Sequence, residues 1–164
     1  MTDIDIKFNL YANTPIIEPK IWSNRSKCFK VIDMLFDTGA GITTLSSPVA
    51  EMLGYKPIKD KKTTIESIGG GKSAGYIIIP NLKIGDFEFG AITAVVSDFS
   101  GNVSSHAILG MNVIKYFNTT IEFNENIELK GIITMRPRFN TDEIKTTENF
   151  NYEYSRFGLY NIRI

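Results

Sequence analysis

One carboxylate stands out by its neighbours along the chain. Asp37 ends the apolar run "MLF" (residues 34–36) and is followed at once by "TGAG" (residues 38–41). A carboxylate at the end of a buried strand is costly unless hydrogen bonds or a function keep it there. The glycines let the backbone turn sharply beside it. Two such carboxylates held close together share one proton, so the pair supplies both the base and the acid that amide hydrolysis without a metal requires. Asp37 is therefore the candidate catalytic residue.

The other residue types that commonly carry chemistry are scarce. Cys28 is the only cysteine and His106 the only histidine. A single thiol forms no internal disulfide, which is typical of a reducing compartment. With one histidine and no plausible ligand spacing, we expect neither a metal site nor an organic cofactor. We expect Cys28 to be a core or strand residue and His106 a loop residue.

Composition and charge narrow the function classes. The 164 residues are 43% hydrophobic and 22% charged, with 18 Lys plus Arg against 18 Asp plus Glu. This balance, without a basic stripe, gives no field that would recruit nucleic acid. No run reaches membrane-spanning length, and the N-terminus lacks the pattern of a signal peptide. We expect one globular domain that works in the cytoplasm, without a nucleic-acid or membrane partner.

Short β-branched and aromatic runs, separated by Gly, Asn and Pro, predict a mostly β chain. Proline in its first turn and a closing glycine predict one short helix at 47–54. The expected elements are strands at 3–12, 28–36, 42–46 and 91–97, two extended arms at 61–80 around a glycine-rich tip, a hairpin at 82–89 turning at Gly85-Asp86, a strand leading into a helix at 107–117, and a closing hairpin at 119–135.

The tip of the extended arms has a competing interpretation. "GKS" at 71–73 matches the end of a phosphate-binding loop. That motif needs a glycine where Glu66 stands and a helix directly afterwards, whereas "AGYIIIP" at 74–80 is strand-like. We therefore reject nucleotide binding. Glycines at this tip favour a mobile lid over a bound peptide, and a plain solvent-exposed turn is the alternative.

Four segments together resemble one family. They are "LFDTGA" at 35–40, the glycine-rich hairpin at 63–79, "ILGMNVIKYF" at 108–117, and the strands "TTIEF" and "IELKG" that follow. They resemble the retropepsin-like aspartic proteases, the single-lobe relatives of pepsin, and "PVAEMLGY" at 48–55 is similar to a helix of bacterial members. The resemblance implies an all-β fold, a single-lobe acid-protease β-barrel with a flap hairpin and one or two short helices. Residues 1–134 would form this protease domain. Residues 135–164 would be an extension packed on it or at the dimer seam.

The resemblance also implies a mechanism and roles for particular residues. The chain holds one Asp-Thr-Gly motif. The pair of catalytic carboxylates (the dyad) would therefore need Asp37 from each subunit of a homodimer that cleaves an extended peptide or protein substrate. Thr38 would brace the two loops, Gly39 would allow close approach, and Ala40 stands where a hydroxyl residue is usual. The flap would use Ile68, Gly69, Gly70 and Gly71, and the support behind the loop would come from Ile108, Leu109, Gly110 and Asn112. Retroviral enzymes carry Arg where this chain has Met111, so the resemblance does not extend to the arginine that helps to brace their dimer.

Two other interpretations stay open from the sequence. One is a catalytically silent protease-like module that dimerises or binds peptides. The other is an unrelated β-barrel with a chance Asp-Thr-Gly. A structure that places Asp37 and Gly110 in adjoining loops would refute the second.

Overall fold

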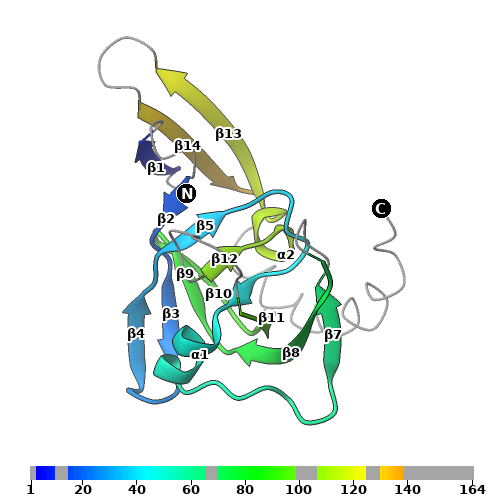
Figure 1. Cartoon of the computed structure of the whole chain (residues 1–164). Helices are drawn as coiled ribbons and strands as arrows, with labels where there is room; N and C mark the ends of the chain where they lie inside the picture. Colours follow the sequence, from blue (N-terminus) through cyan, green and yellow to red (C-terminus); the bar gives the residue numbers. More distant parts are fainter. Residues whose placement is uncertain (1–2, 10–14, 66–69, 99–106, 125–129, 139–164) are drawn as a thin grey trace.

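The computed structural model describes residues 3–9, 15–65, 70–98, 107–124 and 130–138 (Figure 1). In this part of the chain the fold is mostly β with two short helices, which confirms the expected all-β class. The described strands form three sheets. The three-stranded sheet contains β1 (Ile4–Asn9), β13 (Phe117–Asn124) and β14 (Lys130–Pro137), and the four-stranded sheet contains β3 (Lys20–Ser23), β4 (Cys28–Val31), β9 (Leu82–Ile84) and β10 (Phe87–Phe89). The seven-stranded sheet contains β2 (Ile16–Ile17), β5 (Met34–Phe36), β6 (Thr44–Leu45), β7 (Lys62–Ile65), β8 (Lys72–Ile79), β11 (Ile92–Val96) and β12 (Ala107–Leu109).

The largest sheet brings remote segments together in the order β2-β5-β12-β6-β11-β8-β7. Strand β12 lies between β5 and β6, parallel to β5 and antiparallel to β6. It therefore separates the two strands that flank Asp37 in the sequence. Because the side chains of Met34, Phe36, Leu45 and Leu109 are all buried in the core, this arrangement is held by apolar packing as well as by the ladders.

Two further predicted elements are confirmed. Helix α1 (Ser47–Leu53) has proline in its first turn and ends at Gly54, whose φ of 80° is the left-handed conformation that glycine adopts readily. The two extended arms predicted around the glycine-rich tip are β7 and β8, which pair antiparallel with Ile65 opposite Lys72. Residues 71–73 lead into strand β8 and not into a helix, as the rejection of a phosphate-binding loop requires.

The single strand predicted at 28–36 is wrong. The chain forms β4 in the four-stranded sheet, leaves it at Ile32 and Asp33, and starts β5 in the seven-stranded sheet. Ile32 is buried, and its N–H donates to the carbonyl oxygen of Pro19 over 3.0 Å. Because Ile32 at the bend is itself apolar, the sequence gives no sign that one strand ends there and another begins. Cys28 lies on a strand as expected, but its side chain is exposed.

The core between the sheets is rich in aromatic rings. Phe87 and Phe89 lie on the predicted hairpin, which turns at Gly85-Asp86 as expected. Their rings contact Phe117 with centroid separations of 5.3 and 5.7 Å, and Phe89 lies 5.8 Å from Tyr116. Such tilted ring pairs add to the free energy gained from burial. They attach the four-stranded sheet to the segment that follows α2 (Met111–Ile114).

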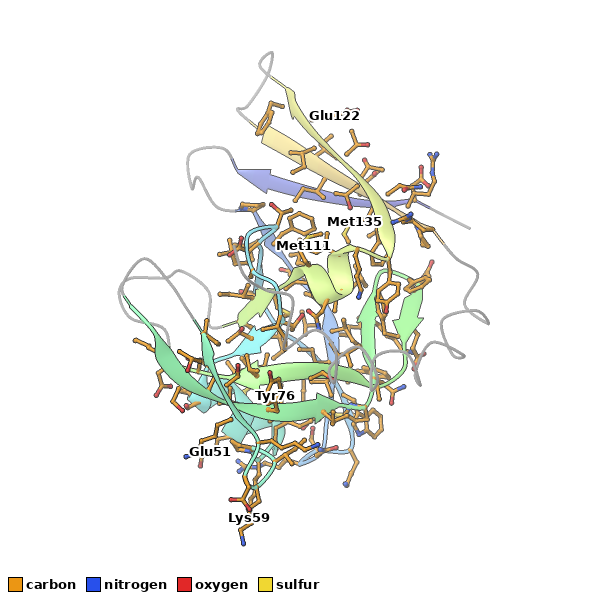
Figure 2. The ribbon with its side chains drawn as sticks, turned by 90° about the vertical axis from the view of Figure 1, so that its right-hand side faces the viewer. Glu51, Lys59, Tyr76, Met111, Glu122 and Met135 are labelled. Carbon is orange, nitrogen blue, oxygen red and sulfur yellow. The ribbon has the colours of Figure 1, made fainter. Side chains whose placement is uncertain are left out.

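The three-stranded sheet extends away from the rest of the molecule (Figure 1). The predicted closing hairpin is confirmed by the pairing of β13 with β14, and its turn lies outside the described residues. Strand β1 pairs with β14, and the Arg136 guanidinium binds both carboxylate oxygens of Asp3 at 2.9 and 2.7 Å. Met135 of this sheet is fully buried in the hydrophobic core, and Met111 of α2 packs against the same core; both are labelled in Figure 2. His106 and residues 139–164 also lie outside the described residues.

Candidate active site

Asp37 lies directly after β5, in a loop (residues 37–43, the Asp37 loop) that leads to β6. Its N–H donates a hydrogen bond to the carbonyl oxygen of Leu109, at the end of β12, over 3.2 Å. The residue after Leu109 is Gly110, so Asp37 and Gly110 lie in adjoining loops. This geometry refutes the interpretation of Asp-Thr-Gly as a chance match in an unrelated fold.

The carboxylate is held by the turn that follows it. The N–H of Gly39 donates to Asp37 Oδ1 over 2.8 Å, and the N–H of Ala40 donates to the Asp37 carbonyl oxygen over 3.3 Å. A Cβ at Gly39 would lie 3.2 Å from Asp37 Oδ1, which is a tight contact for a carbon atom. Asp37 is half-buried, whereas Thr38 and Gly39 are exposed. The turn thus directs the carboxylate while leaving its own outer surface open.

The start of α2 clamps the other end of the turn. The N–H of Met111 donates to the carbonyl oxygen of Ala40 over 2.7 Å, and the N–H of Asn112 donates to that of Gly41 over 3.2 Å. Gly110 must be a glycine here, because a Cβ would lie 2.5 Å from the carbonyl carbon of Ile42. The main chain after Asp37 and the main chain that starts at Gly110 are therefore in direct contact, with no side chain between them.

Two threonines complete the contacts behind the loop. Thr43 is fully buried, and its hydroxyl donates to Asn112 Oδ1 over 2.9 Å while accepting from the N–H of Gly110 over 3.2 Å. Asn112 Nδ2 donates to the carbonyl oxygen of Thr93 over 2.8 Å. Sequence reasoning missed Thr43 and Thr93, since neither stands in a recognisable motif. The only hint was a second polar residue in the otherwise strand-like "ITTLS" (42–46).

The remaining predicted site residues fall into two groups. Leu109 is buried and Ile108 half-buried on β12, which lies between β5 and β6 in the seven-stranded sheet. Gly70 and Gly71 are exposed just before β8, and Gly70 has a φ of 100° that suits a turn. Ile68 and Gly69, the other predicted flap residues, lie outside the described residues. The two arms of the predicted hairpin are thus formed, and the choice between lid and plain turn stays open.

One chain provides only one of the two carboxyl groups that metal-free hydrolysis by a carboxyl pair uses. The chain carries Asp-Thr-Gly once, so one Asp37 carboxylate can be either a base or an acid at a given moment, but not both. In the described part of the chain, no three His, Cys, Asp or Glu side chains gather as a metal site would require. Within the same residues no helix is long and apolar enough to cross a membrane.

The chain was compared with proteins of known structure and with curated proteins. The crystal structure of a retropepsin-like aspartic protease from Rickettsia conorii superposes with a TM-score of 0.58 at 23% identity, over 81% of this chain and 90% of that one. The EIAV protease complexed with the inhibitor HBY-793 gives a TM-score of 0.49 at 20% identity, over 62% and 86% of the two chains. A comparison with curated proteins gave no match. The first likeness confirms the retropepsin-like fold expected from the sequence.

The family model for aspartyl proteases matches residues 28–113. This span runs from β4 to α2, and it includes both the Asp37 loop and Gly110. It accounts for more than half of the 164 residues. The chain therefore belongs to the aspartyl protease family.

Proposed function

We propose that the protein is a homodimeric aspartic endopeptidase that hydrolyses peptide bonds in an extended polypeptide. The observation that carries the proposal is the placement of Asp37. Its carboxylate is half-buried and held by the N–H of Gly39, and its backbone is fixed to β12 through Leu109. A single acid in so fixed a loop, with Thr38 exposed beside it, suits a site completed by the same loop of a second copy.

The proposed reaction uses two Asp37 carboxyl groups that share one proton. The ionised carboxylate takes a proton from a water molecule, whose oxygen attacks the peptide carbonyl carbon. The protonated carboxyl group gives its proton to the carbonyl oxygen, which forms a neutral tetrahedral intermediate. The carboxyl group that took the water proton now gives it to the leaving nitrogen, while the other carboxylate takes a proton from one hydroxyl of the intermediate and the C–N bond breaks. The pair regains its single proton, so the step balances without a metal or an organic cofactor.

The flap hairpin would cover the substrate. Strand β8 pairs with β11, and β11 pairs with β6, which follows the Asp37 loop. The flap is therefore built on the same sheet as the catalytic carboxylate. A lid of this kind would exclude bulk water from the site and select a substrate in an extended conformation. The single cysteine supports a reducing, cytoplasmic setting for this activity.

The test is cleavage of a diverse peptide pool from about pH 4 to about pH 7, the range in which a carboxyl pair changes its protonation. Wild-type protein should cleave, and a pepstatin-type inhibitor should stop it. Asp37→Asn should lower the rate by roughly 10²-fold or more, the usual contribution of general acid-base catalysis. Asp33→Asn is the matched control, because Asp33 is an exposed aspartate four positions earlier in the chain.

Sedimentation of the same preparations separates the possible failures. Cleavage that survives Asp37→Asn would overturn the proposal. A protein that dimerises but cleaves nothing across the pH range would point instead to the catalytically silent, peptide-binding module.

A further inference from the structure

The side-chain amide of Asn112 lies inside the backbone ladder between β11 and the Asp37 loop. The N–H of Thr43 donates to Asn112 Oδ1 over 2.8 Å, and Asn112 Nδ2 donates to the carbonyl oxygen of Thr93 over 2.8 Å. One carboxamide thus accepts from one strand and donates to the other. Both of its polar atoms are satisfied by main-chain groups.

The position of this amide follows from the ladder itself. In the parallel pairing of β11 with β6, the N–H of Val95 donates to the carbonyl oxygen of Thr43, and the N–H of Ser97 donates to that of Leu45, both over 3.0 Å. One step earlier in this pattern, the N–H of Thr43 would donate directly to the carbonyl oxygen of Thr93. The Asn112 carboxamide occupies the place of that bond and behaves as an inserted peptide group.

The insertion lets the Asp37 loop diverge from β11 without leaving polar groups unpaired. The loop must separate from the sheet at Thr43 to bring Asp37 beside Leu109. A direct ladder bond would hold the two strands at the normal spacing, and a missing one would leave a buried N–H and a carbonyl oxygen without partners, which is costly. Because Thr43 is fully buried, water is a poor substitute for the amide at its N–H.

The same amide links the loop to the flap. Thr93 lies on β11 opposite Ile78 of β8, the inner arm of the flap hairpin. The hydroxyl of Thr43 adds a second connection, since it bonds both Asn112 Oδ1 and the N–H of Gly110. We propose that Asn112, through Thr43, is a positioning residue that sets the Asp37 loop relative to the flap strand. This inference rests on the proposed protease activity for its kinetic consequence.

The kinetic test compares substitutions that remove single hydrogen bonds. Asn112→Asp keeps an acceptor for Thr43 but, when ionised, has no donor for Thr93. Thr43→Val keeps the shape of the side chain and loses the hydroxyl, whereas Thr43→Ser retains it. We expect kcat to fall by roughly tenfold to a hundredfold in Asn112→Asp and Thr43→Val, because small displacements of a catalytic group have effects of this size. Thr43→Ser should stay within about twofold of the wild type, and KM should change less than kcat in every variant.

Matched controls come from the exposed side of β13. Asn118→Asp and Thr120→Val make the same chemical changes at exposed positions of that strand, so they should leave kcat unchanged. The folded fraction of each variant is measured alongside. A fall in kcat that merely follows the folded fraction would overturn the positioning role, and so would normal kcat in Asn112→Asp.

Amide hydrogen exchange tests the inserted amide without any activity. In Asn112→Ala, exchange in segments 37–43 and 92–96 should rise by about tenfold or more, because the amide no longer joins them. Asn118→Ala should leave both segments as in the wild type. Unchanged exchange in Asn112→Ala would overturn the inference. If the wild type cleaves no peptide, the proposed function fails, while this measurement still decides whether Asn112 joins the two segments.

Discussion

The N–H of Asp37 donates a hydrogen bond to the carbonyl oxygen of Leu109, a residue whose own side chain is fully buried. The backbone of Asp37 is therefore anchored to the core. Its carboxylate, by contrast, accepts a hydrogen bond from Gly39 in the exposed part of the loop. Because protein cores are densely packed, such an anchor moves little unless the core itself is disturbed. Substitutions in the core beside the loop should change stability, and substitutions on the open side of the loop should change activity.

Gly110→Ala is the sharpest test of the core side. The new Cβ would lie 2.5 Å from the carbonyl carbon of Ile42 and 2.8 Å from the backbone nitrogen of Thr43. Both are main-chain atoms, so the loop must shift. We expect a loss of roughly 1–3 kcal/mol in the free energy of unfolding, as for other overpacked sites. Urea denaturation would measure it. An unchanged midpoint would mean that the two loops are not in contact as described.

Gly39→Ala tests the open side. Its Cβ would meet only Asp37 Oδ1, at 3.2 Å, and Gly39 is exposed. We expect the free energy of unfolding to change by less than about 0.5 kcal/mol. The rate of peptide cleavage should nevertheless fall by about tenfold, because the carboxylate is displaced. The opposite pattern, with lost stability and a normal rate per folded molecule, would contradict the assignment of Asp37.

Mixed dimers test whether two copies share one site. If wild-type protein is equilibrated with an equal amount of Asp37→Asn protein, random exchange of subunits leaves about half of the wild-type chains in wild-type homodimers. The measured activity should then fall to about half of that of the wild type alone. Asp33→Asn added in the same amount should not lower it. Activity unaffected by the Asp37→Asn protein would indicate a site complete in one chain.

Tyr55 makes stability depend on pH in the alkaline range. Its hydroxyl donates to the carbonyl oxygen of Trp22, and burial raises its pKa from 10.0 to about 12. The folded state thus favours the protonated hydroxyl. This contribution is complete below the unfolded pKa near 10 and is lost as the pH rises through 12. Tyr55→Phe should cost about 1–2 kcal/mol at neutral pH, the usual range for a lost hydrogen bond with a buried partner.

The quantity to measure is the difference in stability between the wild type and Tyr55→Phe. Urea midpoints of wild type and Tyr55→Phe, recorded from neutral pH upward, should converge as the hydroxyl ionises. Because every other tyrosine is shared by the two proteins, its titration cancels in this difference. A constant difference across that range would contradict the role given to the Tyr55 hydroxyl.

Much of the fold could be predicted because local patterns agree with it. Short β-branched and aromatic runs predicted β1, the two arms around the glycine-rich tip and the closing hairpin, and Pro48 with Gly54 predicted α1. The bend at Ile32 and Asp33 could not be predicted, because a buried isoleucine continues the apolar run through it. Strands β2 and β3 were also missed. They are two and four residues long, too short to show periodicity.

The residues of the candidate site likewise divide into those that the sequence indicated and those that it did not. Asp37 and Gly110 were found because each lies in a short motif with a backbone requirement. Thr43 and Thr93 were not, because their partner is the Asn112 side chain, which comes from a remote segment. Asn112 was itself expected to support the loop, but nothing in the sequence indicated that its amide would stand in a strand ladder.

The pairing of β1 with β14, with its Asp3–Arg136 contact, also sets an order on events at the ribosome. Among the described strands β1 is synthesised first, and it must wait for β14, the last of them, before it has a partner. The segments around Asp37 and Gly110 are all synthesised earlier, and chains generally fold as their N-terminal parts become available. A nascent chain that stalls just before Lys130 would thus contain every described strand of the seven-stranded sheet, while β1 remains without its only ladder partner among the described strands.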